Sequence, residues 1–271
     1  VFALDSLDAV AVWTDAGATV ATFALRAPEG SLDLHGTIAA SAGHAGNAEA
    51  RLRWKLGEVE YGGTLKAQGD GRKATLALNL DAPTPANLEF DLAQTDALAW
   101  TLRAKLPRFD PQRVQAETSL KALALDLEGH GDKQTGAIEG TLTLDEHVVQ
   151  LAPLRYALDG QTLRIESLAL KSPEHPGQVD AKGSLQLDAK PIAAQAQISW
   201  NGVELPAELV GQVLATHGSL SAKGNADAFH VDGAAAIGPP GRLSDLAFDL
   251  DGTPQTITLK QLALKQAKGG L

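Results

Sequence analysis

The sequence contains no cysteine and few aromatic residues. The absence of cysteine excludes disulfides, thiolate metal sites and cysteine nucleophiles. Aromatic residues make up only 4% of the chain, although large aromatic side chains usually dominate a closed core. The apolar positions are instead filled mainly by Ala, Leu, Val, Ile and Gly. These side chains form a smooth, shallow surface that is poorly suited to filling the space between two packed sheets.

Basic residues are also scarce, with 23 Lys and Arg against 33 Asp and Glu and a formal net charge of −10. Duplex binding needs a basic face, so nucleic acid is not an expected partner. With 44% hydrophobic residues the chain has enough apolar material to fold. No apolar run reaches the roughly 20 residues of a membrane-spanning helix. Because the chain starts at Val1 without a signal peptide, we expect it to be a fragment of a longer protein.

Motifs that carry chemistry are missing as well. No two of the seven histidines stand at the two- to four-residue spacing of zinc ligands. Residues 69–74 match the letters of a GxGxxA loop, but a strand pattern follows where a nucleotide-binding loop needs a helix, which predicts a hairpin turn. Residues 249–252 resemble half a calcium loop without its remaining ligands. We therefore expect no enzyme, no catalytic residues, no metal site and no cofactor.

What the sequence does contain is strict alternation. Between residues 178 and 190 every odd position is small or apolar and every even position is polar. After Pro191 the phase shifts, so that the even positions from Ile192 to Trp200 are apolar. A period of two predicts a β-strand with one apolar and one polar side. Similar runs fill nearly the whole length, so the function must lie in a face of a sheet.

Turn signals separate these runs every ten to twenty residues, which predicts successive long antiparallel strands in one wide, twisted sheet. One of them, Asn201-Gly202, predicts a hairpin turn. Residues 205–216 are the exception and predict a short helix. Leu205, Leu209 and Val213 recur at steps of four, and Pro206 suits the first turn of a helix. No domain boundary is evident, so residues 1–271 are expected to form one continuous β segment.

Five segments resemble the TamB family, a subunit of the translocation and assembly module and a member of the AsmA-like bridge-type lipid transfer group: residues 136–144, 151–171, 177–188, 198–205 and 218–224. The resemblance extends over most of the chain. It implies an all-β fold in which one long antiparallel amphipathic sheet folds lengthwise into an open, twisted gutter with an apolar interior. It also implies a place in the periplasm of a Gram-negative bacterium, within an inner-membrane-anchored protein, and an outer-membrane barrel partner that meets other parts of the parent.

The resemblance and the alternation together predict a groove that shields phospholipid acyl chains between the two membranes and supports outer-membrane biogenesis. The same residues could instead pack against each other in a closed core. One alternative function is a protein-handling scaffold that assists outer-membrane barrel or autotransporter insertion by strand addition. Another is a surface β-solenoid stalk, although no tight repeat is visible. The predicted groove lining is Val179, Ala181, Leu185, Leu187, Ile192, Ala194, Ala196, Ile198 and Trp200.

Overall fold

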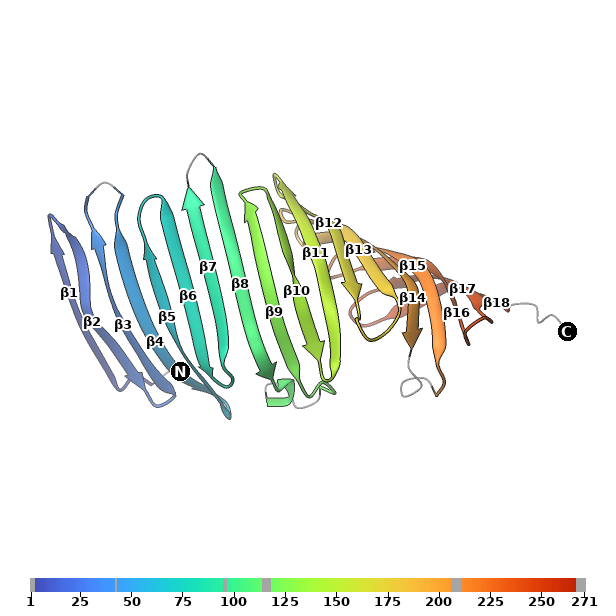
Figure 1. Cartoon of the computed structure of the whole chain (residues 1–271), viewed down its shortest axis with the longest axis horizontal. Helices are drawn as coiled ribbons and strands as arrows, with labels where there is room; N and C mark the ends of the chain where they lie inside the picture. The colour runs from blue at the N-terminus through green and yellow to red at the C-terminus, as the bar shows by residue number, and fades with distance from the viewer. Residues whose placement is uncertain (1–2, 42, 95–96, 114–117, 206–210, 267–271) are drawn as a thin grey trace. The chain divides into compact units, whose positions relative to one another are not determined.

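A computed structural model describes residues 3–41, 43–94, 97–113, 118–205 and 211–266. Within these ranges the chain forms eighteen β-strands and one short 3-10 helix, η1 (Figure 1). The strands belong to one open antiparallel sheet, so the predicted all-β fold is confirmed. Among the same residues, none of the helical segments has the length and apolar character needed to cross a bilayer. The folding of the sheet into a gutter stays a prediction.

The backbone divides into two compact units. Unit 1 comprises residues 1–133 and 140–146, and unit 2 comprises residues 134–139 and 147–271. Strand β10 (Thr135–Leu144) contributes to both. The sequence pattern gives no sign of this division, because Ile138, Gly140, Leu142 and Leu144 continue the alternation through it.

In unit 1 each strand from β1 to β9 pairs antiparallel with the next along the chain. Directly paired residues project to the same side of a sheet. One such row crosses all nine strands and is apolar throughout: Ala9, Phe23, Leu34, Ala50, Leu65, Leu78, Leu88, Ala104 and Leu127. The elements are β1 (Ser6–Thr14), β2 (Gly17–Ala27), β3 (Gly30–Ala39), β4 (Gly46–Leu56), β5 (Val59–Gly69), β6 (Lys73–Ala82), β7 (Ala86–Gln94), β8 (Leu98–Phe109), η1 (Pro111–Arg113) and β9 (Leu123–Asp132).

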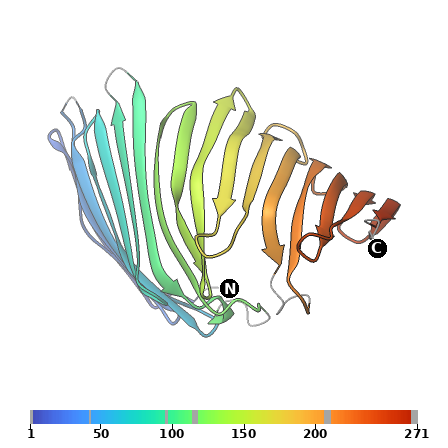
Figure 2. The ribbon, with the colours of Figure 1, turned by 45° about the vertical axis from the view of Figure 1, so that its right-hand side comes forward.

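In unit 2 the strands from β11 to β18 follow the same plan, each pairing antiparallel with the next (yellow-green to red in Figure 2). The connections between them range from two residues, between β11 and β12, to eight residues, between β14 and β15. The strands are β11 (His147–Asp159), β12 (Thr162–Lys171), β13 (Gln178–Gln186), β14 (Ala193–Leu205), β15 (Leu214–Gly224), β16 (Phe229–Gly238), β17 (Ser244–Gly252) and β18 (Ile257–Lys265).

Two of the predicted turns have different outcomes. Residues 69–74 form the predicted hairpin turn between β5 and β6, where the Asp70 side chain accepts hydrogen bonds from the backbone N–H groups of Arg72 and Lys73. The prediction for Asn201-Gly202 is wrong, because β14 runs straight through it. The pairing of β14 with β15 shifts register between Trp200 and Val203, and Gly202 adopts φ 63°. The Asn-Gly pair therefore supplies the left-handed residue of a β-bulge.

The predicted helix over residues 205–216 is wrong at both of its ends. Leu205 closes β14, whereas Leu214 opens β15 and pairs with it. Thr216, two residues further along β15, accepts a hydrogen bond from the Trp200 indole N–H at 3.0 Å. Pairing with a neighbouring strand overrides the local helical spacing. The middle of the predicted helix, residues 206–210, lies outside the described residues.

The sheet has almost no closed core. Apart from glycines, the residues buried within the described ranges are Ala236, 7% exposed, and Thr216, 8% exposed. The chain exposes 17932 Å², whereas a globular protein of its mass exposes roughly 11,000 Å². The apolar rows are therefore not covered by a second layer, and the closed-core alternative does not describe this structure.

Aromatic rings on the apolar side of unit 2 lie over glycines of the neighbouring strand. Trp200 pairs with Gly218, and Phe248 pairs with Gly233. A Cβ atom added to Gly233 would lie 2.8 Å from Cζ of Phe248. Rings placed over glycines keep this side shallow and fix the register of the strands.

Replacing Gly218 by alanine tests this packing. The new Cβ would lie 2.5 Å from the Ala234 carbonyl oxygen and 2.7 Å from Cζ2 of Trp200, so the strands must shift. We expect Gly218→Ala to lower the free energy of unfolding by about 1–3 kcal/mol, measured by urea denaturation followed by circular dichroism. The control is Ser219→Ala on the exposed polar side, with an expected change within about 0.5 kcal/mol. Equal stability of the two variants would contradict the packing.

Candidate functional site

The predicted lining residues lie on one side of β13 and β14. Their register pairs Val179 with Trp200, Ala181 with Ile198, and Leu185 with Ala194, while Ala196 pairs with Gly183. All of these residues are half-buried. Seven of the nine predicted residues thus share one face, which supports the predicted alternation.

The other two predicted residues lie just outside the strands. Strand β13 ends at Gln186, so Leu187 enters the following turn, where it is 43% exposed. Its backbone N–H still bonds to the carbonyl of Gln161 at 2.8 Å. Ile192 precedes β14 and is 50% exposed. The alternation up to Lys190 therefore overestimates the length of β13.

The lining residues belong to a larger surface, which we call the apolar face of unit 2. Four rows of seven directly paired residues cross β12 to β18 without one polar side chain. The rows are Leu163, Leu185, Ala194, Gly224, Phe229, Gly252, Ile257; Ile165, Gly183, Ala196, Ala222, Val231, Leu250, Leu259; Leu168, Ala181, Ile198, Leu220, Gly233, Phe248, Leu262; and Leu170, Val179, Trp200, Gly218, Ala235, Leu246, Leu264.

Small residues gather near the middle of this face. Gly183, Ala196 and Ala222 are consecutive members of one row, between the larger Ile165 and Val231. The row therefore has a low stretch about three strands wide, or roughly 10 Å. A surface of this kind offers no hydrogen-bonding group, so it can contact an alkyl chain but cannot orient a polar ligand.

A large hollow of unit 2 is lined by both polar and apolar positions of the strands. It has a volume of about 1120 Å³ and is lined by residues of all the strands from β11 to β18. Its lining combines polar residues such as Asp180 and Lys182 with six members of one apolar row: Leu168, Ala181, Ile198, Leu220, Gly233 and Phe248. Charges of both signs line it, which does not suit an acyl chain. The lipid hypothesis therefore depends on the open apolar face alone.

A charged cluster surrounds His230 on the polar face. Its Nδ1 atom lies 2.8 Å from Oδ1 of Asp251 and 3.6 Å from Oδ1 of Asp249, and its Nε2 atom lies 3.5 Å from Oδ1 of Asp232. Lys260 forms an ion pair with the other oxygen of Asp251. The Lys260 hydrogen bond, followed by that from His230, lowers the pKa of Asp251, and Asp251 in turn raises the pKa of Lys260. This cluster links β16, β17 and β18, while the buried Oδ1 atom of Asp249 accepts no hydrogen bond.

Lys260→Met should raise the pKa of Asp251 toward its ordinary value, because the strongest hydrogen bond to the carboxylate is lost. The folded-state pKa of Asp251 is depressed, so its contribution to stability is present above the unfolded-state pKa of about 3.9 and is lost as the pH falls through the folded value. NMR titration of the side-chain carboxyl carbon measures the shift. Lys265→Met, at the end of β18, is the control. An unchanged Asp251 pKa in Lys260→Met would contradict the assignment.

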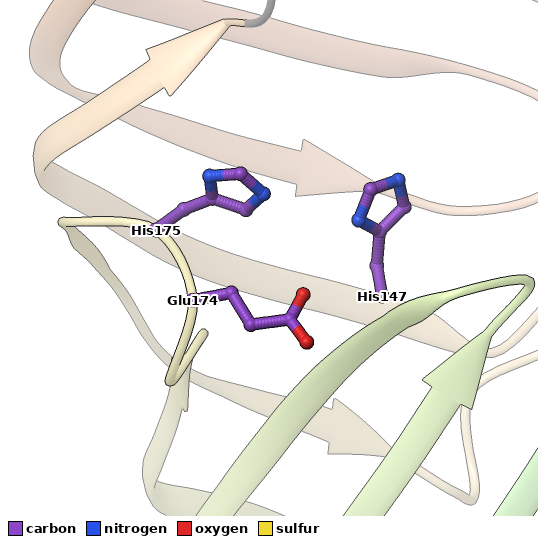
Figure 3. Close-up of side chains that lie close together, drawn as sticks. All are labelled: His147, Glu174 and His175. Atoms are coloured by element: carbon purple, nitrogen blue, oxygen red, sulfur yellow. The ribbon is translucent and has the colours of Figure 1, made fainter.

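A second cluster consists of His147, Glu174 and His175 (Figure 3). His147 is the first residue of β11, and the other two lie in the turn between β12 and β13. The donor atoms of the three exposed side chains all lie within 4.8 Å of one another. Sequence reasoning missed this cluster because 28 positions separate the two histidines, and no local spacing signals their proximity.

Comparison of the chain with protein-family models, with curated proteins and with solved structures gives no match. The similarity to the TamB family consequently depends on the segments of sequence that carry it. The function must be argued from the faces of the sheet.

Proposed function

We propose that this chain is part of a non-enzymatic periplasmic protein whose apolar face shields the acyl chains of phospholipid passing between the inner and outer membranes. The observation that carries the proposal is the apolar face itself. Its four rows contain no polar side chain, and no second layer covers them in the described part of the chain. Water-exposed apolar surface of this extent marks an interaction site. The TamB resemblance supplies the compartment and the class of lipid.

The dimensions of the face suit a lipid tail. Strands lie about 4.8 Å apart, so a row across seven strands extends roughly 29 Å. One leaflet of a bilayer core is about 15 Å thick, so a single row can contact an acyl chain over its full length. Each buried CH₂ group contributes about 0.8 kcal/mol. The absence of hydrogen-bonding groups lets the chain slide from row to row.

Photo-crosslinking at neighbouring positions tests which face meets lipid. Leu185 lies on the apolar face, and the next residue, Gln186, is exposed on the polar face. A photoreactive residue at Leu185 should capture phospholipid in cells, whereas the same residue at Gln186 should not. Mass spectrometry of the adducts provides the measurement. Lipid adducts at neither position, with Leu185 joined only to residues of the protein itself, would refute the proposal.

A charged residue placed on the apolar face should block lipid binding without unfolding the sheet. Ala196→Glu puts a carboxylate in the low stretch of the face, where an acyl chain would desolvate it. We expect binding of a fluorescent phospholipid to the purified 271-residue chain to weaken at least tenfold. Gln197→Glu adds the same charge on the exposed polar face and should bind as the parent does. Equal binding by both variants would exclude this face as the lipid site.

Strand addition remains a second candidate function, and one observation favours it. Every residue of β1 and of β18 is exposed, including Trp13 at 83% and Ile257 at 71%. Exposed strands of this kind are templates for a further strand. A client bound in this way would crosslink to positions along β1, which lies outside the apolar face of unit 2, whereas lipid would crosslink to Leu185.

A further inference from the structure

We propose that His147, Glu174 and His175 form a surface binding site for a divalent transition metal ion of the zinc type. This site would lie in unit 2 and is independent of the lipid proposal. It would join the beginning of β11 to the turn between β12 and β13.

Two segments of chain bring the three side chains together. The imidazole rings of His147 and His175 have centroids 5.8 Å apart and are inclined at 53°. Glu174 extends between them, and all three side chains converge on one space (Figure 3). The turn is held by Ser172, whose hydroxyl oxygen accepts hydrogen bonds from the backbone N–H groups of Glu174 at 3.2 Å and His175 at 3.3 Å. The backbone that carries two of the three ligands is therefore already positioned.

The cluster around His230 and the cluster of His147, Glu174 and His175 differ in the hydrogen bonds and ion pairs that their side chains already form. Around His230 a cation is already present, because Lys260 and the imidazole both contact Asp251, although Oδ1 of Asp249 accepts no hydrogen bond. For His147, Glu174 and His175, the residues that the structure describes offer no hydrogen bond or ion pair to the side-chain donor atoms. A cation is the species that would satisfy all three at once, because each presents a lone pair to the shared space.

The donor set selects the class of metal. Two imidazoles and one carboxylate suit zinc, copper or nickel, whereas calcium and magnesium prefer oxygen ligands alone. Zinc binds imidazole nitrogen at about 2.0 Å, which places two ligands of one tetrahedral ion roughly 3.3 Å apart. The present separations, up to 4.8 Å, can close by rotation of exposed side chains. Water would complete the fourth position.

Isothermal titration of the 271-residue chain with zinc chloride at pH 7.5 tests the site. We expect one high-affinity ion per chain, with binding at least tenfold weaker in His147→Ala, Glu174→Gln and His175→Ala. Binding should also weaken in acidic buffer, because an imidazole must be deprotonated to bind the ion. His230→Ala is the matched control and should bind zinc like the parent. Circular dichroism checks that each variant folds, as expected for exposed residues.

The possible results of the titration distinguish the proposed site from the alternatives. Loss of the single ion in the three site variants, with binding retained in His230→Ala, supports the proposal. Its loss in His230→Ala would assign the ion to the other cluster and overturn the proposal. Unchanged binding in all four variants, or no binding by the parent at millimolar zinc, would overturn it as well. Zinc-dependent NMR shifts confined to the amides of residues 147 and 172–177 would add positive support.

Discussion

In-register antiparallel pairing is the constraint on which this structure depends. Strands β2 to β8 and β12 to β17 form backbone hydrogen bonds with both of their sequence neighbours. Directly paired residues lie on the same face, so the orientation of one strand determines that of the next. Ala181, Ile198, Leu220 and Gly233 lie on one face for this reason. One strand placed with the wrong register would put its polar side chains into four apolar rows. The amphipathic face is therefore a cooperative property of the sheet.

A sheet built in this way is stabilised mainly by contacts between neighbouring strands. With Ala236 as the buried hydrophobic residue of the described ranges, cross-strand pairs must replace the contacts that a core would supply. Aromatic rings contribute most where they cover a glycine, as Trp200 does over Gly218. Ion pairs on the polar face, such as Lys105 with Asp126 at 3.0 Å, are exposed and add little. The exposed apolar face is an energetic cost that a bound lipid would offset.

Sequence patterns predicted the features that depend on a single strand. The period of two identified the strands and their faces, because side-chain alternation follows from the backbone of one strand. Residues 205–216 and Asn201-Gly202 were misread, since their conformations depend on the partner strand: Leu214 is held by Leu205, and Gly202 accommodates a bulge against β15. The cluster of His147 with His175 is a product of topology, and no spacing within the sequence could reveal it.

The two faces of unit 2 differ in chemistry, because one is apolar and the other carries the charged side chains. An apolar face made of Leu, Ala and Gly can distinguish alkyl from polar matter, but it has no means of choosing one lipid over another. Any selectivity must then come from polar groups at its margins. His147, Glu174 and His175 lie at the strand ends, where β11 begins and β12 turns into β13. A metal ion there would hold the ends of three strands together. It would place no charge on the apolar rows, so the sheet would be stabilised while the lipid path stayed uncharged.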